Sequence, residues 1–330
     1  MKIKIEDARK LCEEVLTKKD FSKKEIKIVV DEYIEGELLG KLSHGLIAFP
    51  SLIKSFGIPK EKWAIEKETH SSVFINGNKN FGLIVGKEAV EIICKKAKKE
   101  GIGFAALRNI LPFLRPRTIA KMISEKGMIG IVVNNGGREM TVPEGGIDPV
   151  LATNPIGVGI PTREDPIIFD MATSERAFGE VTVAKILGHF LPEQTFLDKN
   201  GNYTTDPNEA SAVVPMGKYK GYALGLLLEI LTGSLVDMPM GIRDKGRDYR
   251  SSERGAIFLA IDPSFFTDLD EFKKRNSELV SQIKSSRKAK GVNEILIPGE
   301  RAKRKREENL RRGYFEVNDS VIENIRKFLE

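Results

Sequence analysis

Cysteine and histidine are scarce in this 330-residue chain, which contains two cysteines and three histidines. Cys12 and Cys94 fall in separate segments of helical periodicity, and the sequence has no Cys-x-x-Cys pair and no cluster of cysteine with histidine. Such clusters hold structural zinc, and paired cysteines cross-link small secreted domains. We therefore expect neither a zinc scaffold nor a disulfide scaffold, and no metal site.

Long apolar runs are also lacking. The longest candidate, residues 222–235, is broken by two glycines and a glutamate and falls short of the roughly 18–20 residues that cross a bilayer. The first residues carry mixed charges and lack the apolar middle of a signal peptide. We expect a cytoplasmic protein that does not associate with a membrane.

Charge of one sign is concentrated in a single place. The net charge of +6 is spread along the chain except for the basic run at residues 301–312. Glu307 and Glu308 interrupt that run, and no aromatic residue lies within it to stack on a base, so it is typical of a solvated helix face. We expect no nucleic-acid partner. The 41% hydrophobic and 30% charged residues have the balance of a soluble globular protein.

The periodicity of apolar residues changes along the chain. Residues 1–71 follow a helical period, and Ser22 with Glu25 three residues later has the pattern of a capping box. Beyond residue 72, Asn76-Gly77 between two apolar runs predicts a hairpin of strands 72–75 and 81–85. Further predicted elements are helices at 86–99, 118–125, 219–235, 265–284 and 321–329, with Ser320 as the cap of the last, and strands at 103–107, 129–133, 167–169 and 256–261.

These elements predict an α/β fold in which a helical domain built from both termini, residues 1–71 and 266–330, accompanies a central α/β domain, residues 72–265. Gly101-Ile102-Gly103 nearly matches the glycine pattern of a dinucleotide loop. It follows a predicted helix and opens a predicted strand, whereas the Rossmann fingerprint requires the strand first. We therefore expect a fold without a Rossmann dinucleotide site.

One histidine has a distinctive context. His44 lies in Ser43-His44-Gly45, which places a hydroxyl and a titratable ring beside backbone that can approach a ligand closely. Asp170 ends the buried strand 167–169, and a carboxylate bonded to a histidine ring fixes its tautomer and raises its pKa, as a general acid near neutral pH requires. The alternatives are a packing role for His44 and a helix-capping role for Asp170.

Two further segments favour ligand contacts. Residues 153–161 combine two prolines with spaced glycines and polar side chains, a rigid backbone that can present N–H groups. Residues 217–222 place two lysines and two tyrosines at the start of a predicted helix, where an anion such as phosphate is favoured.

Taken together, these segments resemble the malate/L-lactate dehydrogenase family, also called sulfolactate dehydrogenase-like, which includes ureidoglycolate dehydrogenases, diketogulonate reductases and cyclic-imine reductases. The likeness rests on motifs in family order at residues 43–45, 143–146, 153–161, 170–174, 205–207, 219–222, 260–263 and 298–300. The resemblance implies a non-Rossmann fold, a homodimer with the active site near its interface, and reversible reduction of a 2-oxo acid or cyclic imine to a 2-hydroxy acid or cyclic amino acid by NADH or NADPH.

The resemblance also implies roles for individual residues. His44 is the expected proton donor and Asp170 its partner, so these two are the expected catalytic residues. The expected cofactor or substrate contacts are Ser43, Gly145, Gly146, Thr153, Asn154, Thr173, Ser174, Lys220, Gly221, Gly299 and Glu300.

The chain departs from the family pattern at the substrate side. Relatives usually carry an arginine four positions after the histidine, and here that residue is Ala48. The segment from Asn109 to Pro112 lacks a histidine that many relatives have, and Glu180 occupies a position that is often lysine. Arg108, Arg115 and Arg117 are candidates to replace the missing arginine. A catalytically impaired member that binds a ligand or partner therefore stays open as the alternative function.

Overall fold

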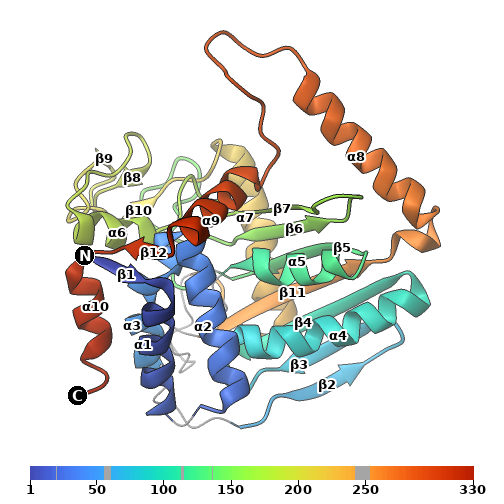
Figure 1. The fold of residues 1–330 in the computed structure, drawn as a ribbon, viewed down its shortest axis with the longest axis horizontal. Helices are drawn as coiled ribbons and strands as arrows, with labels where there is room; N and C mark the ends of the chain where they lie inside the picture. The colour runs from blue at the N-terminus through green and yellow to red at the C-terminus, as the bar shows by residue number, and fades with distance from the viewer. Residues whose placement is uncertain (20, 56–60, 113–114, 136, 242–252) are drawn as a thin grey trace.

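The computed structural model describes residues 1–19, 21–55, 61–112, 115–135, 137–241 and 253–330. The two ends of the chain meet in one layer, where β1 (Lys2–Lys4) pairs antiparallel with β12 (Tyr314–Glu316). Helix α1 (Ile5–Thr17) packs between α2 (Lys23–Leu38) and α10 (Asp319–Arg326) (Figure 1). The expectation that helices from both termini pack together is confirmed.

A seven-stranded mixed sheet lies beside this layer, in the order β2-β3-β4-β11-β5-β6-β7. Only the β3–β4 pair is parallel, and the other neighbours run antiparallel. The strands are β2 (Ala64–Glu68), β3 (Ser72–Asn76), β4 (Ile102–Ile110), β5 (Ile129–Asn134), β6 (Ile156–Ile160), β7 (Ile167–Met171) and β11 (Arg254–Ile261). This order is not that of a Rossmann sheet, in which the strands run mostly parallel.

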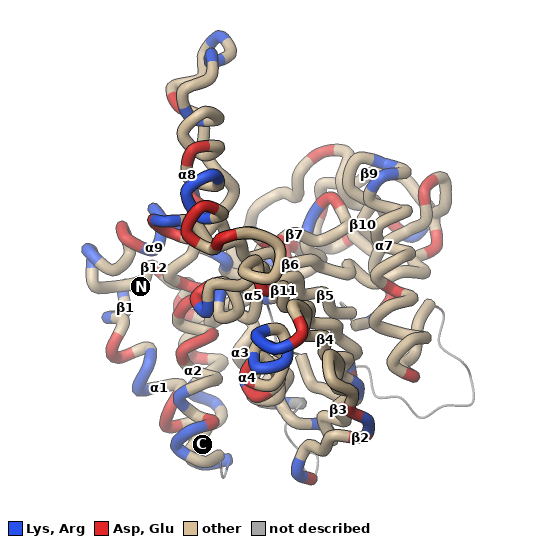
Figure 2. The backbone as a smooth tube through the Cα atoms, turned by 90° about the vertical axis from the view of Figure 1, so that its right-hand side faces the viewer, with Lys and Arg blue, Asp and Glu red and all other residues tan. Residues whose placement is uncertain are grey.

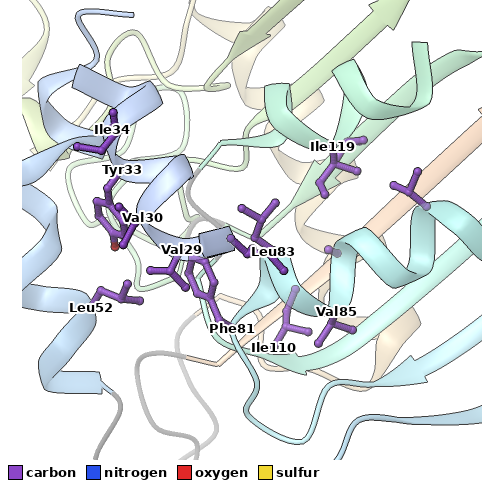
Figure 3. Packing of buried hydrophobic residues seen from close by; sticks show 14 of the residues in the cluster. Val29, Val30, Tyr33, Ile34, Leu52, Phe81, Leu83, Val85, Ile110 and Ile119 are labelled. Atoms are coloured by element: carbon purple, nitrogen blue, oxygen red, sulfur yellow. The ribbon is translucent and has the colours of Figure 1, made fainter. Parts of the chain in front are cut away.

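Apolar residues alternate between the two faces of the sheet. One face packs against α4 (Gly82–Glu100) and α5 (Pro116–Glu125), and α2 packs on α4. These elements share the main core, where Tyr33 meets Phe49 edge to face with ring centroids 5.2 Å apart. Figure 3 shows side chains of this core from α2, from the start of α4 and from α5. The opposite face packs against α7 (Tyr219–Thr232) in a smaller cluster that contains Ile257. A separate small sheet consists of β8 (Phe196–Leu197), β9 (Tyr203–Thr204) and β10 (Ala212–Val213).

The predicted hairpin at residues 72–85 is wrong. Residues 82–85 begin α4, which connects β3 to its parallel neighbour β4. Periodicity alone does not distinguish a short buried helix segment from a strand, and this apolar run is buried at the start of a helix. Gly77 is needed for close approach, because a methyl group there would overlap the Ile110 side chain.

Other elements differ from the predictions in smaller ways. The helical period expected through residue 71 fails at β2, a strand of exposed residues that pairs with β3. The sequence did not predict α6 (Gly179–Leu187) or β6. The capping box of Ser22 and Glu25 is confirmed, whereas the last helix is capped by Asn318 and not by Ser320. The basic run forms α9 (Glu300–Arg312), and residues 49–55 and 269–285 form α3 and α8.

The glycines of Gly101-Ile102-Gly103, which nearly match a dinucleotide loop, allow close packing of a helix. Gly101 ends α4 with a φ of +80°, and a methyl group at Gly103 would overlap the backbone carbonyl of Ile93. The glycines therefore allow α4 to lie directly on β4.

Within the described ranges, no helix combines the length and apolar character that a membrane span requires.

Candidate active site

The loop that carries His44 is clamped onto the end of α2. A methyl group at Gly36 would overlap the backbone carbonyl of His44, and one at Gly45 would overlap the Glu37 carboxylate. The buried Glu37 Oε1 accepts a hydrogen bond from the Leu46 N–H at 2.7 Å. Since backbone and side chain fit this closely, the position of the His44 loop is set by α2.

The His44 ring is held by its neighbour in sequence. Ser43 Oγ lies 2.9 Å from His44 Nδ1, and the ring is half-buried. When the hydroxyl donates to Nδ1, the ring proton sits on Nε2, where it can be donated to a ligand. A methyl group at Gly179 would press on the Ser43 side chain, so α6 begins directly against this pair.

The electrostatics of His44 differ from the expectation. Burial, together with the positive charges of Arg115 and Lys41, lowers the pKa of His44 to about 4. The expected rise in pKa is therefore wrong. The carboxylate that was to cause it does not bond to the ring: no hydrogen bond joins Asp170 to His44 among the described residues. His44 is thus neutral at pH 7, and its role as proton donor stays a prediction.

Asp170 lies within β7, opposite Gly157 of β6, and so it does not cap a helix. Its charge acts on Arg117, whose pKa is lowered by burial while Asp170 opposes that shift. Arg117 Nη1 donates to the Ile168 carbonyl at 2.6 Å. The carboxylate is thus positioned beside a guanidinium.

The N-terminus of α5 connects the two predicted catalytic residues. Arg115, directly before this helix, acts on His44, and Arg117, in its first turn, acts on Asp170. Arg115 is fully buried, and its Nε donates to Glu32 Oε1 at 2.8 Å. The start of α5 therefore brings two cations and a helix N-terminus to the region between His44 and Asp170, an environment that favours anions.

A second group of predicted residues lies around the start of α7. Thr173 donates to the Thr153 carbonyl through both its backbone N–H and its hydroxyl, at 3.0 and 3.1 Å. A methyl group at Gly221 would overlap the Thr173 carbonyl, while Lys220 beside it is exposed. Asn154 is fully buried, and its amide donates to Glu229 Oε2 at 2.5 Å. The remaining neighbour, Ser174, donates to the Arg176 carbonyl at 2.7 Å.

A third group lines a cavity of about 880 Å³ next to β7. Gly299 and Glu300 lie on its wall with Ile168, and a methyl group at Gly299 would overlap the Ile168 carbonyl. The cations that line the cavity are Arg117, Lys121, Lys284, Lys303 and Arg306.

The other two predicted glycines lie elsewhere. Gly145 and Gly146 form a turn closed by the Gly146 N–H on the Pro143 carbonyl at 2.9 Å, and the next residue, Ile147, lies against Gly201 near the small sheet. None of the contacts described joins this turn to the other three groups.

Comparison with known proteins shows to which protein family this chain belongs. The model of the malate/L-lactate dehydrogenase family matches residues 3–326. This chain belongs to the malate/L-lactate dehydrogenase family. The malate/(S)-sulfolactate dehydrogenase of Methanothermus fervidus is 35% identical to it over 100% of this chain and 98% of its own length. The Δ1-pyrroline-2-carboxylate/Δ1-piperideine-2-carboxylate reductase of Pseudomonas putida is 32% identical over 66% of this chain and 64% of its own length.

A solved structure of the family has the same fold. The sulfolactate dehydrogenase from Methanocaldococcus jannaschii has a TM-score of 0.88 and 33% identity, covering 99% of this chain and 96% of that one. The expected non-Rossmann fold of the malate/L-lactate dehydrogenase family is confirmed.

The departures from the family pattern have distinct surroundings. Ala48 is half-buried and packs against the main core. Glu180 lies near Lys41, and burial raises the pKa of its carboxyl. Asn109 takes a φ of +50° and donates to Asn76 Oδ1 at 3.1 Å, so it is held within the sheet edge. Glu37 could not be singled out from the sequence, because its partner is the Leu46 N–H, a backbone group that only the turn after α2 brings near.

Proposed function

We propose that this chain is an oxidoreductase that transfers a hydride between a nicotinamide cofactor, NAD or NADP, and a small 2-oxo acid or cyclic imine. The observation that carries the proposal is the Ser43–His44 pair, held rigidly on α2 in a member of this dehydrogenase family. Relatives named as sulfolactate dehydrogenase and as cyclic-imine carboxylate reductase support both substrate types.

The residues present suit a dinucleotide. Ligand pockets generally occupy about 300–1,000 Å³, and the cavity beside β7 has about 880 Å³. Five lysine and arginine side chains line it together with four carboxylates, and Lys284, Lys303 and Arg306 pair with three of these carboxylates. Phosphate groups would take over those cations. Gly299 and Glu300 would hold the cofactor from α9, and Thr173 and Lys220 would hold it from the start of α7. The cofactor supplies the hydride.

His44 would supply the proton. Hydride reaching a carbonyl carbon leaves negative charge on the oxygen, so a donor must be positioned there. A neutral imidazole with its proton on Nε2 can act in this way, as the neutral histidine of triosephosphate isomerase does. Ser43 would select that tautomer, and the hydroxyl and ring are 2.9 Å apart. Asp170 would act on the site through Arg117, the charge it lies beside.

Cofactor binding and turnover test the proposal directly. We expect nicotinamide fluorescence to change when NADH or NADPH is mixed with the protein, and one reduced cofactor to be consumed with at least one member of a panel of 2-oxo acids and cyclic imines. Comparing the two cofactors decides between NAD and NADP. Binding without any turnover would instead support the alternative that this chain is a catalytically impaired family member. That alternative is suggested by Ala48, which stands where relatives usually carry arginine.

We also propose that the protein is a cytoplasmic homodimer. Cys12 and Cys94 are both unpaired, as is usual in a reducing compartment. Figure 1 shows α8 (Leu269–Ser285) projecting from the body, none of its residues is buried, and Leu279 and Ile283 are exposed on it. Figure 2 shows charges of both signs along this helix. An apolar surface on a projecting helix supports packing against a second copy.

Sedimentation equilibrium tests this assembly. We expect a mass of twice 36.8 kDa at micromolar concentration. Leu279→Glu and Ile283→Glu together should shift the equilibrium toward monomer, because they place charge in the apolar surface. The matched control is Lys273→Glu on the same helix. A wild-type mass of one chain would refute the dimer.

A further inference from the structure

Arg115 has a buried donor that no described residue of the protein accepts. The residue is 2% exposed, and Nε and Nη2 donate to Glu32 at 2.8 and 2.9 Å. Nη1 is buried and has no hydrogen-bond partner among the residues that the structure describes. Leaving a buried donor of a charged group unpaired is costly, so such a group calls for a specific explanation.

The surroundings of Arg115 point to an anion. The residue directly precedes α5, a helix of 10 residues, and its guanidinium adds to the positive end of that helix. Glu32, which Arg115 binds, lies one turn before Gly36 on α2, and Gly36 directly contacts the backbone of His44. The guanidinium is therefore near the His44 loop, and its charge contributes to the lowered pKa of the ring. Glu32 both accepts from Arg115 and accepts from the Thr118 hydroxyl at 2.7 Å, which holds the guanidinium in one orientation.

We propose that Arg115 binds the carboxylate of the substrate through Nη1, beside His44. It would thereby replace the arginine that relatives usually carry at the position of Ala48. This inference rests on the proposed function. Both 2-oxo acids and cyclic-imine carboxylates carry a carboxylate next to the carbon that accepts hydride. An arginine fixed by Glu32 would therefore place the reacting carbon toward the histidine, and the pairing of guanidinium with carboxylate is strong and directional.

The other two candidate arginines are committed elsewhere. Arg108 also has a buried nitrogen, Nε, without a described partner, but its two terminal nitrogens pair with Glu66 at 2.7 Å and with Asp237 at 3.2 Å, and it lies over the Phe74 ring. Arg117 donates to the Ile168 carbonyl and lines the cavity beside β7. Neither affects the pKa of His44, whereas Arg115 does.

The test compares the best 2-oxo acid of the panel with its methyl ester. In Arg115→Lys, which keeps the charge but loses the fork, we expect the preference in kcat/KM for the acid over the ester to fall about ten- to a hundredfold, the range for a hydrogen bond to a charged group. Turnover of the ester and affinity for the cofactor should change little. Oxamate, a carboxylate that is not reduced, should bind the enzyme–NADH complex correspondingly more weakly.

Arg9→Lys is the control, since it makes the same change at an arginine that pairs with Asp31 of α2 and has no part in the proposed site, and it should keep the preference for the acid. If Arg115→Lys does not fold, the double variant Glu32→Gln/Arg115→Gln removes both buried charges and provides the same comparison. An unchanged acid-to-ester ratio with lowered thermal stability would show that Arg115 only ties α2 to α5, and would overturn the inference.

The measurements distinguish failure of the proposed function from failure of the inference about Arg115. A wild-type protein that reduces no carbonyl or imine would overturn that function, while the difference in oxamate binding between wild type and Arg115→Lys would still decide on Arg115. A wild-type protein that does not bind oxamate would overturn the inference about Arg115 even if other substrates are reduced.

Discussion

Replacing His44 by alanine is expected to lower kcat by about 10²–10⁴-fold, the usual contribution of a positioned proton donor. The ring lies in the tightly packed loop after α2, and Ser43 orients it through Nδ1. Affinity for the reduced cofactor should fall much less, because the ring acts at the reacting oxygen or nitrogen. Initial rates with the true substrate and fluorescence titration of the cofactor measure the two effects separately.

His189→Ala provides the matched control, since that histidine is exposed at the end of α6. It should leave kcat unchanged. Asp170→Asn should also lower kcat, because it removes the charge beside Arg117 while keeping the shape of the side chain. A His44→Ala enzyme with nearly wild-type turnover would exclude His44 as the donor.

The local features of this chain could be predicted from the sequence. The capping box of Ser22 and Glu25 depends on residues three apart, and it forms as expected. The motif around His44 could be singled out because serine, histidine and glycine are adjacent. Their ordered occurrence with the later motifs indicated the family, and hence the non-Rossmann fold, which no single element could have indicated.

Interactions between distant residues could not be predicted in this way. Arg115 and Glu32 are 83 positions apart, and only the folded chain, in which α2 and α5 both pack against α4, makes them partners. Burial of the ring and the cation that this packing places near it lower the pKa of His44, where a bond to Asp170 was expected to raise it. The hairpin failed for a similar reason, because Gly77 is required by its contact with Ile110 in β4.

Glu37→Gln is expected to change how stability depends on pH. Burial raises the pKa of Glu37 to about 7 from its ordinary value of 4.5. The folded state therefore binds more protons than the unfolded state between these values, and the free energy of unfolding falls as pH rises from about 4.5 to 7. At 1.36 kcal/mol per pKa unit, the buried carboxylate costs on the order of 3 kcal/mol at pH 8.

Glutamine keeps an oxygen that can accept from the Leu46 N–H and carries no charge. The variant should therefore exceed wild type in stability by up to on the order of 3 kcal/mol at pH 8, and the difference should vanish near pH 4.5. Urea unfolding at a series of pH values measures it. The control is Glu100→Gln, which removes the same charge from an exposed side chain and should give a far smaller difference.

His44 has the opposite effect on the pH dependence of stability, and its loop packs against Glu37. Its pKa is lowered to about 4 from 6.5, so the unfolded state binds more protons between these values and stability falls as pH drops through this range. Between about pH 4.5 and 6.5 the two contributions oppose each other, and wild-type stability should vary little on their account. Glu37→Gln should reveal the His44 contribution as a loss of stability below pH 6.5. Parallel curves for wild type and variant from pH 5 to 8 would show that Glu37 is ionised without cost in the folded protein.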